Sequence, residues 1–183
     1  MIDVPLDEHG KVQSRAIAEH MKDRGIEEIY ASPMKRSVWT ANEIAGGYQD
    51  IPVQEDPRLC PWDPGKLAGQ PVKHVLDDIR ALYRDETRTP PGGGEPFRDF
   101  RVRWLTRLRE LLARVHDKDI TICGVTHSRN LQCAMAWVAA GAPDDLSIDL
   151  PTMGDYYNGV VTGGELELQP MGETGTLRTK ARQ

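Results

Sequence analysis

The most regular pattern of apolar side chains in the sequence lies between residues 97 and 115. The apolar residues recur there at intervals of three and four: Phe97, Phe100, Trp104, Leu105, Leu108, Leu111, Leu112 and Val115. This spacing follows one face of an α-helix, so the segment is predicted to be an amphipathic helix. A weaker stripe of the same kind predicts a first helix over residues 7–24. Asp7 is a good N-cap residue for that helix, and Gly25 is a good stop.

Short apolar runs alternate with helical patterns along the rest of the chain. Strands are predicted at residues 26–31, 51–53 and 119–126 and, near the end, at 156–162 and 166–168. The run at 119–126 has an almost continuous apolar centre, which is typical of a strand buried on both faces. Further helices are predicted at residues 32–47, 74–84 and 128–140, the first with Ser32 as N-cap and Pro33 in its first turn.

Strands that alternate with helices predict an α/β fold, a three-layer α/β/α sandwich with a mostly parallel sheet. We find no internal repeat and no linker, so residues 1–172 are expected to form one domain, followed by a polar, disordered tail at 173–183. In such sheets, ligands bind beyond the carboxyl ends of the strands. This rule selects residues 32–36 and residues 126–130 as candidate binding segments.

Composition excludes several classes of protein. No apolar run is long enough to span a bilayer, and the acidic start MIDVPLDEHG is not a signal peptide. Three cysteines without a Cys-x-x-Cys spacing fit a reducing cytoplasm and no structural zinc. The 23 Lys and Arg against 28 Asp and Glu, a net charge of −5, argue against binding to a nucleic acid backbone. We therefore expect a cytoplasmic protein with no metal or cofactor and no nucleic acid or membrane partner.

Both candidate segments carry a side chain suited to a phosphoryl anion. Arg36 lies in the first turn of a predicted helix, where its guanidinium and the positive helix end can hold phosphate oxygens. His127 follows the most buried strand and can donate a hydrogen bond or act as an acid or base. The alternatives are a surface arginine and a histidine bonded to backbone. Because Arg36 and His127 are both predicted to lie at the same edge of the sheet, a shared anion site is favoured.

Five segments, taken together in order, resemble one known family. Residues 31–41, Ala-Ser-Pro-Met-Lys-Arg-Ser-Val-Trp-Thr-Ala, resemble the Ser-Ser-x-x-x-Arg-Ala-x-x-Thr-Ala segment of the histidine phosphatase superfamily, the phosphoglycerate mutase-like proteins. Residues 125–128, Val-Thr-His-Ser, resemble its Ser-His-Gly segment. Residues 4–13 resemble its Pro-Leu-Thr-x-x-Gly-x-x-Gln helix start, residues 57–69 its Leu-x-Glu-x-x-x-Gly-x-x-x-Gly stretch, and residues 91–99 its Pro-Gly-Gly-Glu-Ser-x-x-Asp loop.

The resemblance implies a phosphatase that hydrolyses a small phosphomonoester through a phosphohistidine. In that mechanism a neutral histidine attacks phosphorus, the leaving oxygen is protonated, and water then cleaves the phosphoenzyme. Arginines and a second histidine stabilise the charge on the equatorial oxygens. By position, Arg36 matches a phosphate-pocket arginine, His127 matches the second histidine, and Ser128 follows it in the phosphate-binding segment.

The sequence departs from the family pattern in two places. The family nucleophile lies in an Arg-His-Gly segment after its first strand, and these 183 residues contain no Arg-His-Gly. We therefore expect the first family strand to be absent, through a misplaced start codon or a gene fragment, and the chain as given to be inactive. In addition, Pro61 stands where the family has its acidic Glu, which leaves Asp63 or Glu95 as the candidate proton donor.

Other functions remain open at this point. One alternative is a non-catalytic module of the same fold that binds phosphate or a partner. Another is a mutase that transfers the phosphoryl group. The sequence does not decide whether the protein forms a homodimer.

Overall fold

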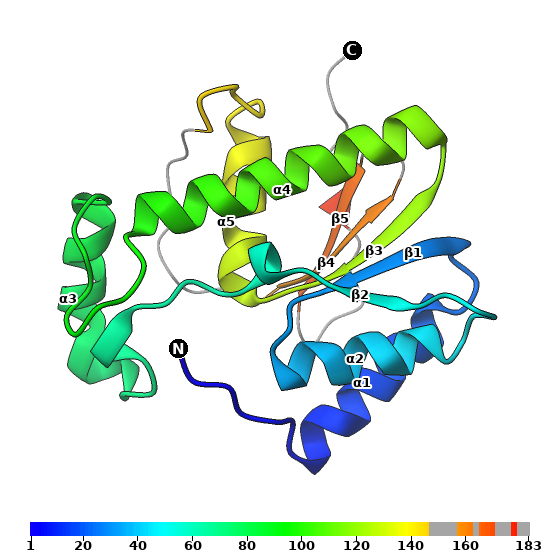
Figure 1. The fold of residues 1–183 in the computed structure, drawn as a ribbon, viewed down its shortest axis with the longest axis horizontal. Helices are drawn as coiled ribbons and strands as arrows, with labels where there is room; N and C mark the ends of the chain where they lie inside the picture. The colour runs from blue at the N-terminus through cyan, green and yellow to red at the C-terminus, as the bar shows by residue number, and fades with distance from the viewer. Residues whose placement is uncertain (147–156, 163–164, 171–176, 179–183) are drawn as a thin grey trace.

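The fold is built around two small sheets with helices on either side (Figure 1). The computed structural model describes residues 1–146, and beyond them the backbone of residues 157–162, 165–170 and 177–178. The helices are α1 (Glu8–Met21), α2 (Lys35–Ala45), α3 (Val72–Arg84), α4 (Phe97–Lys118) and α5 (Ser128–Ala139). The strands are β1 (Ile26–Ala31), β2 (Val53–Glu55), β3 (Thr121–Val125), β4 (Tyr157–Thr162), β5 (Glu165–Pro170) and β6 (Leu177–Arg178). Two 3₁₀ turns, η1 (Pro57–Leu59) and η2 (Gly65–Leu67), interrupt the segment between β2 and α3.

The first sheet is parallel and has the strand order β2-β1-β3. Ile29 of β1 pairs with Val53 on one side and with Cys123 on the other. At the carboxyl end Ala31 lies opposite Val125, so the segments that follow β1 and β3 leave the sheet side by side. The second sheet, β4-β5-β6, is antiparallel.

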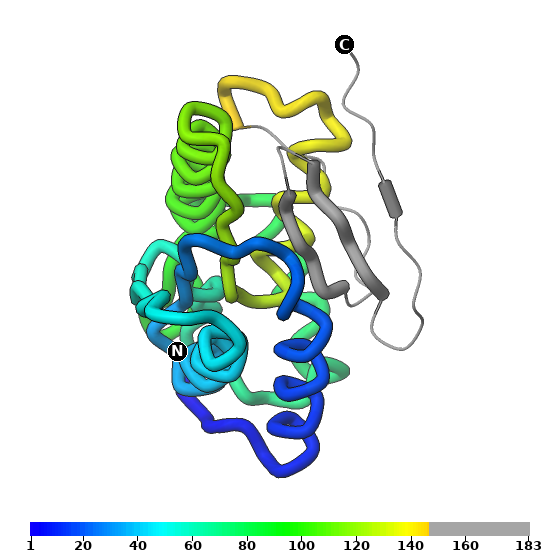
Figure 2. The backbone as a smooth tube through the Cα atoms, turned by 90° about the vertical axis from the view of Figure 1, so that its right-hand side faces the viewer, coloured from blue at the N-terminus to red at the C-terminus, as the bar shows by residue number. Residues whose placement is uncertain are grey.

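Side chains on β1 alternate between two apolar clusters, and this alternation creates the layers. Ile29 and Ala31 pack into a cluster with Met21 of α1 and Ile44 of α2. Tyr30 points the other way, into the cluster that includes Trp104 and its neighbours on α4. Figure 2 shows the two helix layers from the side, with α1 (blue) and α2 (light blue) at one end and α4 (green) at the other. The three-layer α/β sandwich predicted from the sequence is thereby confirmed.

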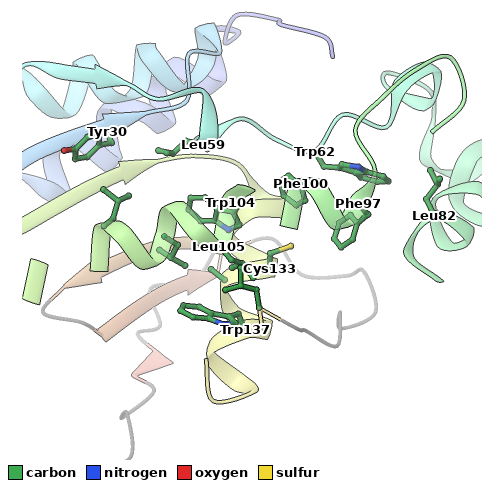
Figure 3. Packing of buried hydrophobic residues seen from close by; sticks show 14 of the residues in the cluster. Tyr30, Leu59, Trp62, Leu82, Phe97, Phe100, Trp104, Leu105, Cys133 and Trp137 are labelled. Carbon is green, nitrogen blue, oxygen red and sulfur yellow. The ribbon is translucent and has the colours of Figure 1, made fainter. Parts of the chain in front are cut away.

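Helix α4 supplies the larger core, as the periodicity predicts. Phe97, Phe100 and Leu105 are fully buried, and Trp104 donates a hydrogen bond from Nε1 to the Asn130 carbonyl of α5 at 2.7 Å. Figure 3 shows Trp104 and Leu105 near Cys133 and Trp137 of α5. Phe97 and Phe100 lie near Trp62, and Leu82 extends the cluster toward α3. The helix ends at Asp119, whose backbone adopts the left-handed conformation with φ of 52°.

Several element boundaries differ from the sequence prediction: α1 ends at Met21 rather than at residue 24, and α3 begins at Val72 rather than at residue 74. Strand β2 lies two residues later than predicted, because its pairing with β1 runs to Glu55 through polar, solvent-facing positions that an apolar pattern does not mark. Helix α2 begins at Lys35, with Met34 rather than Ser32 at the N-cap. The Ser32 N–H instead continues the sheet by donating to the Val125 carbonyl at 2.9 Å.

The end of the chain is described only in part. Strands β4 and β5 confirm the predicted final pair, while residues 163–164 between them lie outside the described residues. Leu177–Arg178 form β6 within the segment predicted as a disordered tail, and the rest of that segment also lies outside the described residues.

Candidate functional site

The site forms where β1 and β3 end next to each other. Ser32 follows β1 directly, and His127 lies two residues beyond β3 at the N-cap of α5. The imidazole Nε2 of His127 lies 2.9 Å from Ser32 Oγ and 3.4 Å from Ser37 Oγ. Its Nδ1 lies 3.3 Å from Nη2 of Arg36. The two segments selected from the sequence, some ninety positions apart, thus meet through their side chains.

The contact with Arg36 fixes the proton arrangement of the imidazole. A guanidinium has donors only, so Nδ1 of His127 must be the acceptor of this bond. The neutral ring therefore carries its proton on Nε2 and donates to Ser32 Oγ. Ser32 is fully buried, and its hydroxyl in turn accepts from the Met34 N–H at 3.4 Å.

Burial is the main electrostatic influence on His127. It lowers the pKa of the imidazole from 6.5 to about 3, with the positive charge of Arg36 acting in the same direction and Asp3 opposing it. The ring is consequently neutral near neutral pH in the unliganded protein. An anion placed beside it would counter both effects.

A hollow of about 360 Å³ opens in front of this pair. Its walls are formed by Leu6, Arg36, Ser37, Pro61, Thr126, His127, Ser128 and Arg129. These lining residues include two arginines and no acidic side chain. The first turn of α5 also begins here, and its N–H groups have no partner within the helix. Positive charge and backbone N–H donors, with no carboxylate among the lining residues, make the hollow suited to an anion.

Pro61 lines the hollow and ends residues 57–61, a segment that the sequence analysis matched to the family without indicating what holds it in place. The Leu59 carbonyl accepts from Thr126 Oγ1 at 2.8 Å, and the Cys60 carbonyl accepts from Asn130 Nδ2 at 3.2 Å. From the other side, Arg103 of α4 donates to the Arg58 carbonyl at 2.8 Å. Asn130 and Arg103 thus position the wall. No local motif distinguishes either residue, because each acts on backbone carbonyls more than forty positions away.

Ser128 lines the hollow, as the resemblance implies, whereas the two candidate acids do not. Asp63 caps a turn: its Oδ1 accepts from the Gly65 N–H, and its Oδ2 pairs with the amino group of Met1, both at 3.1 Å. Glu95 is bound at both carboxylate oxygens by Arg103, each at 2.8 Å. The assignment of a proton donor therefore stays a prediction.

The described part of the chain offers neither a metal site nor a helix suited to cross a membrane. There, no cluster of three or more His, Cys, Asp or Glu side chains is arranged to hold a metal ion. Nor does any helix in that part combine the length and apolar character that a membrane crossing requires. Cys123 lies in the core, where burial raises the pKa of its thiol to about 12.

Comparisons with known proteins bear on this geometry. A family model described as the histidine phosphatase superfamily (branch 1) matches residues 1–156. Phosphoserine phosphatase 1 of Hydrogenobacter thermophilus is 28% identical over 145 residues, which is 75% of this chain and 67% of the relative. Fructose-2,6-bisphosphatase TIGAR B of Danio rerio is 26% identical over 153 residues, 82% of this chain and 58% of the relative. The chain thus spans roughly three fifths to two thirds of these relatives.

The fold has also been seen in solved structures. A mycobacterial glucosyl-3-phosphoglycerate phosphatase complexed with VO3 superposes with a TM-score of 0.64 at 22% identity. The superposition covers 92% of this chain and 86% of that protein. It shows that the two chains share a fold.

The depressed pKa of His127 predicts an acid-sensitive fold. Between pH 6.5 and about 3 the unfolded chain binds a proton at this ring that the folded protein does not. The free energy of unfolding should therefore fall by about 1.4 kcal/mol per pH unit as the pH is lowered through this window, and His127 should contribute no slope above it. In His127→Gln this contribution should disappear, so urea unfolding midpoints should depend less steeply on pH.

The exposed His9→Gln, at the start of α1, controls for the loss of a surface imidazole. Equal slopes for His127→Gln and the parent between pH 6.5 and 4 would show that His127 is protonated normally in the folded protein.

Proposed function

Because the chain belongs to the histidine phosphatase superfamily, as its match over residues 1–156 establishes, we propose that the hollow binds the phosphoryl group of a small phosphomonoester. The observation that carries this proposal is the convergence of Arg36 and His127 on one hollow without an acidic lining residue. Phosphatase activity is the chemistry of the superfamily and of the named relatives. Their substrates, phosphoserine and fructose-2,6-bisphosphate by name, support the class of a small phosphorylated metabolite.

Each lining group has a definite role in this proposal. When phosphate binds, the guanidinium of Arg36 leaves Nδ1 of His127 and donates hydrogen bonds to two phosphate oxygens. His127 donates from Nε2 and gains a proton at Nδ1 once the dianion offsets the cost of burying the charge. Ser128 contributes the N–H groups of the first turn of α5, and Arg129 supplies a second positive charge at the rim.

Turnover requires a nucleophile that these residues do not supply. Among the side chains that line the hollow, His127 is the one histidine, and it occupies the position of the second histidine rather than that of the nucleophile. Its Nδ1 lone pair faces Arg36, not the open space. We infer that the 183-residue chain binds phosphomonoesters without forming a phosphohistidine, which makes it a phosphate-binding module of a phosphatase fold.

In a form that carries a nucleophile, Asp63 is our proposed proton donor. Pro61, two positions away, lines the hollow. Among the described residues, Asp63 accepts from the Gly65 N–H and pairs with the terminal amino group of Met1, and the second of these bonds is lost in a form extended before Met1. Glu95 would first have to leave both of its bonds to Arg103. Asp63 is therefore the easier carboxylate to move toward a leaving oxygen.

Phosphate or vanadate should raise the melting temperature of the chain, because an anion that binds only the folded state stabilises it by mass action. Arg36→Ala and His127→Ala should each weaken anion affinity by about tenfold or more, since each removes a charge-assisted or buried donor. Thermal shift against a vanadate series measures this change. Arg15→Ala, on the exposed face of α1, is the matched control. An unchanged vanadate response in both site variants would show that the anion binds elsewhere.

The 183-residue chain is expected to leave p-nitrophenyl phosphate intact and to give no acid-labile phosphoprotein. A form extended at its amino end by a strand and an Arg-His-Gly segment should hydrolyse this ester. Phosphate release and acid-labile labelling, compared between the two forms, measure the difference. Equal hydrolysis by both forms would reveal a nucleophile within the 183 residues and contradict the proposal.

The same extended form separates the two candidate acids. Asp63→Asn should slow hydrolysis of a poor leaving group by about 10²–10⁴-fold and that of p-nitrophenyl phosphate much less. A larger loss from Glu95→Gln would transfer the role to Glu95.

A further inference from the structure

The two arginines that line the hollow are held by different elements. Arg36 on α2 contacts Nδ1 of His127 at 3.3 Å. Arg129, the second residue of α5, places its guanidinium over the ring of Tyr83 on α3, 5.2 Å from the ring centroid. It also donates from Nη1 to Oε1 of Gln132, three positions further along α5, at 2.6 Å. Because α5 lies between α2 and α3 (Figure 1), these contacts draw the two arginines toward different sides of the hollow.

The contacts with Tyr83 and Gln132 orient the guanidinium of Arg129 without neutralising it. Burial raises the pKa of Tyr83 to about 12, so its phenol is uncharged near neutral pH, and the side chain of Gln132 is an amide. The face of an aromatic ring attracts a cation and favours a guanidinium that lies over it. These two contacts therefore leave Arg129 with its positive charge, in a defined orientation at the rim of the hollow.

The phosphoryl group of the proposed substrate has donors enough without Arg129. Its three terminal oxygens can be bound by the two-pronged guanidinium of Arg36 and by Nε2 of His127, with the first N–H groups of α5 beside them. To reach the same oxygens, Arg129 would have to leave both the ring of Tyr83 and the amide of Gln132. A second anionic group on the substrate can instead meet Arg129 where it is already held.

Charge balance and shape both favour a carboxylate as this second group. A phosphoryl group carries about two negative charges near neutral pH. The hollow offers Arg36, Arg129 and, once an anion is bound, the imidazolium of His127. A carboxylate supplies the third negative charge, whereas a second phosphoryl dianion would leave negative charge in excess. The planar edge of a guanidinium also matches the two oxygens of a carboxylate.

We propose that Arg129 determines substrate specificity by binding a carboxylate that the phosphomonoester carries a few atoms away from its phosphoryl group, and that Tyr83 positions Arg129 for this contact. The inference rests on the phosphoryl site proposed above and narrows the substrate to a small phosphorylated carboxylic acid.

Two esters that differ in the carboxylate test the role of Arg129: 3-(phosphonooxy)propanoate and 3-hydroxypropyl phosphate. In titration calorimetry, the 183-residue protein should bind the first about tenfold or more tightly than the second, because a charge-assisted pair forms at Arg129. Arg129→Gln should remove this preference, so that both esters bind alike. Arg80→Gln removes the same charge from the exposed face of α3 and should keep the preference of the parent.

Variants of Tyr83 test whether the ring positions Arg129. Tyr83→Leu keeps the charge of Arg129 but removes the aromatic face, and should reduce the preference for the carboxylate ester by about threefold. Tyr83→Phe keeps the ring and should retain the preference. The preference is a ratio measured within each variant, so altered packing against Trp62 and Phe97 that weakens every ligand does not change it.

Inorganic phosphate, titrated beside the two esters, distinguishes failure of this inference from failure of the phosphoryl site. If phosphate and both esters bind without preference for the carboxylate, the role of Arg129 is wrong and the phosphoryl site stands. An equal loss of affinity for all three ligands in Arg129→Gln would assign Arg129 to the phosphoryl group and would also overturn the inference. If none of the three binds, the phosphoryl site fails and the inference fails with it. An unchanged preference in Tyr83→Leu would contradict the positioning role of Tyr83.

Discussion

The pairing of β1 with β3 is the interaction on which the site depends. Because Ala31 lies opposite Val125 in a parallel register, the residues that follow both strands emerge at one edge. Ser32 then becomes the partner of His127, and the first turns of α2 and α5 start side by side. A shift of β3 by one residue against β1 would turn Cys123 away from the α1–α2 cluster, so the same apolar packing that stabilises the sheet fixes the geometry of the site.

At the hollow, burial and the positive charge of Arg36 both disfavour protonation of His127, and a bound anion would counter both effects. His127 is held neutral by its surroundings and accepts a hydrogen bond from the guanidinium of Arg36. In the free protein the charge of Arg36 opposes a positive charge on the ring, which therefore stays neutral. A dianionic phosphoryl group reverses the sign of that interaction, which makes the pair selective for charge as well as for shape.

Much of this could be predicted from the sequence. The strong period of residues 97–115 predicted α4, the Asp7 N-cap predicted the start of α1, and the two strand-end segments predicted where Arg36 and His127 would meet. The sequence did not indicate the residues that position the wall of the hollow, because their roles depend on contacts between distant segments. Arg103 and Asn130 act on the carbonyls of residues 57–61, and Glu95 is engaged by Arg103; no periodicity or motif records such contacts. The polar residues of β2 were missed for a related reason, because pairing rather than side-chain polarity defines that strand.

The ionisation of His127 during anion binding is the central claim, and nitrogen NMR of the imidazole measures it directly. In the free protein at neutral pH, the account predicts the resonances of a neutral ring protonated at Nε2. Saturation with phosphate should move both ring nitrogens to the values of an imidazolium. Resonances of a charged ring in the free protein, or signals that do not change on saturation with phosphate, would contradict the account.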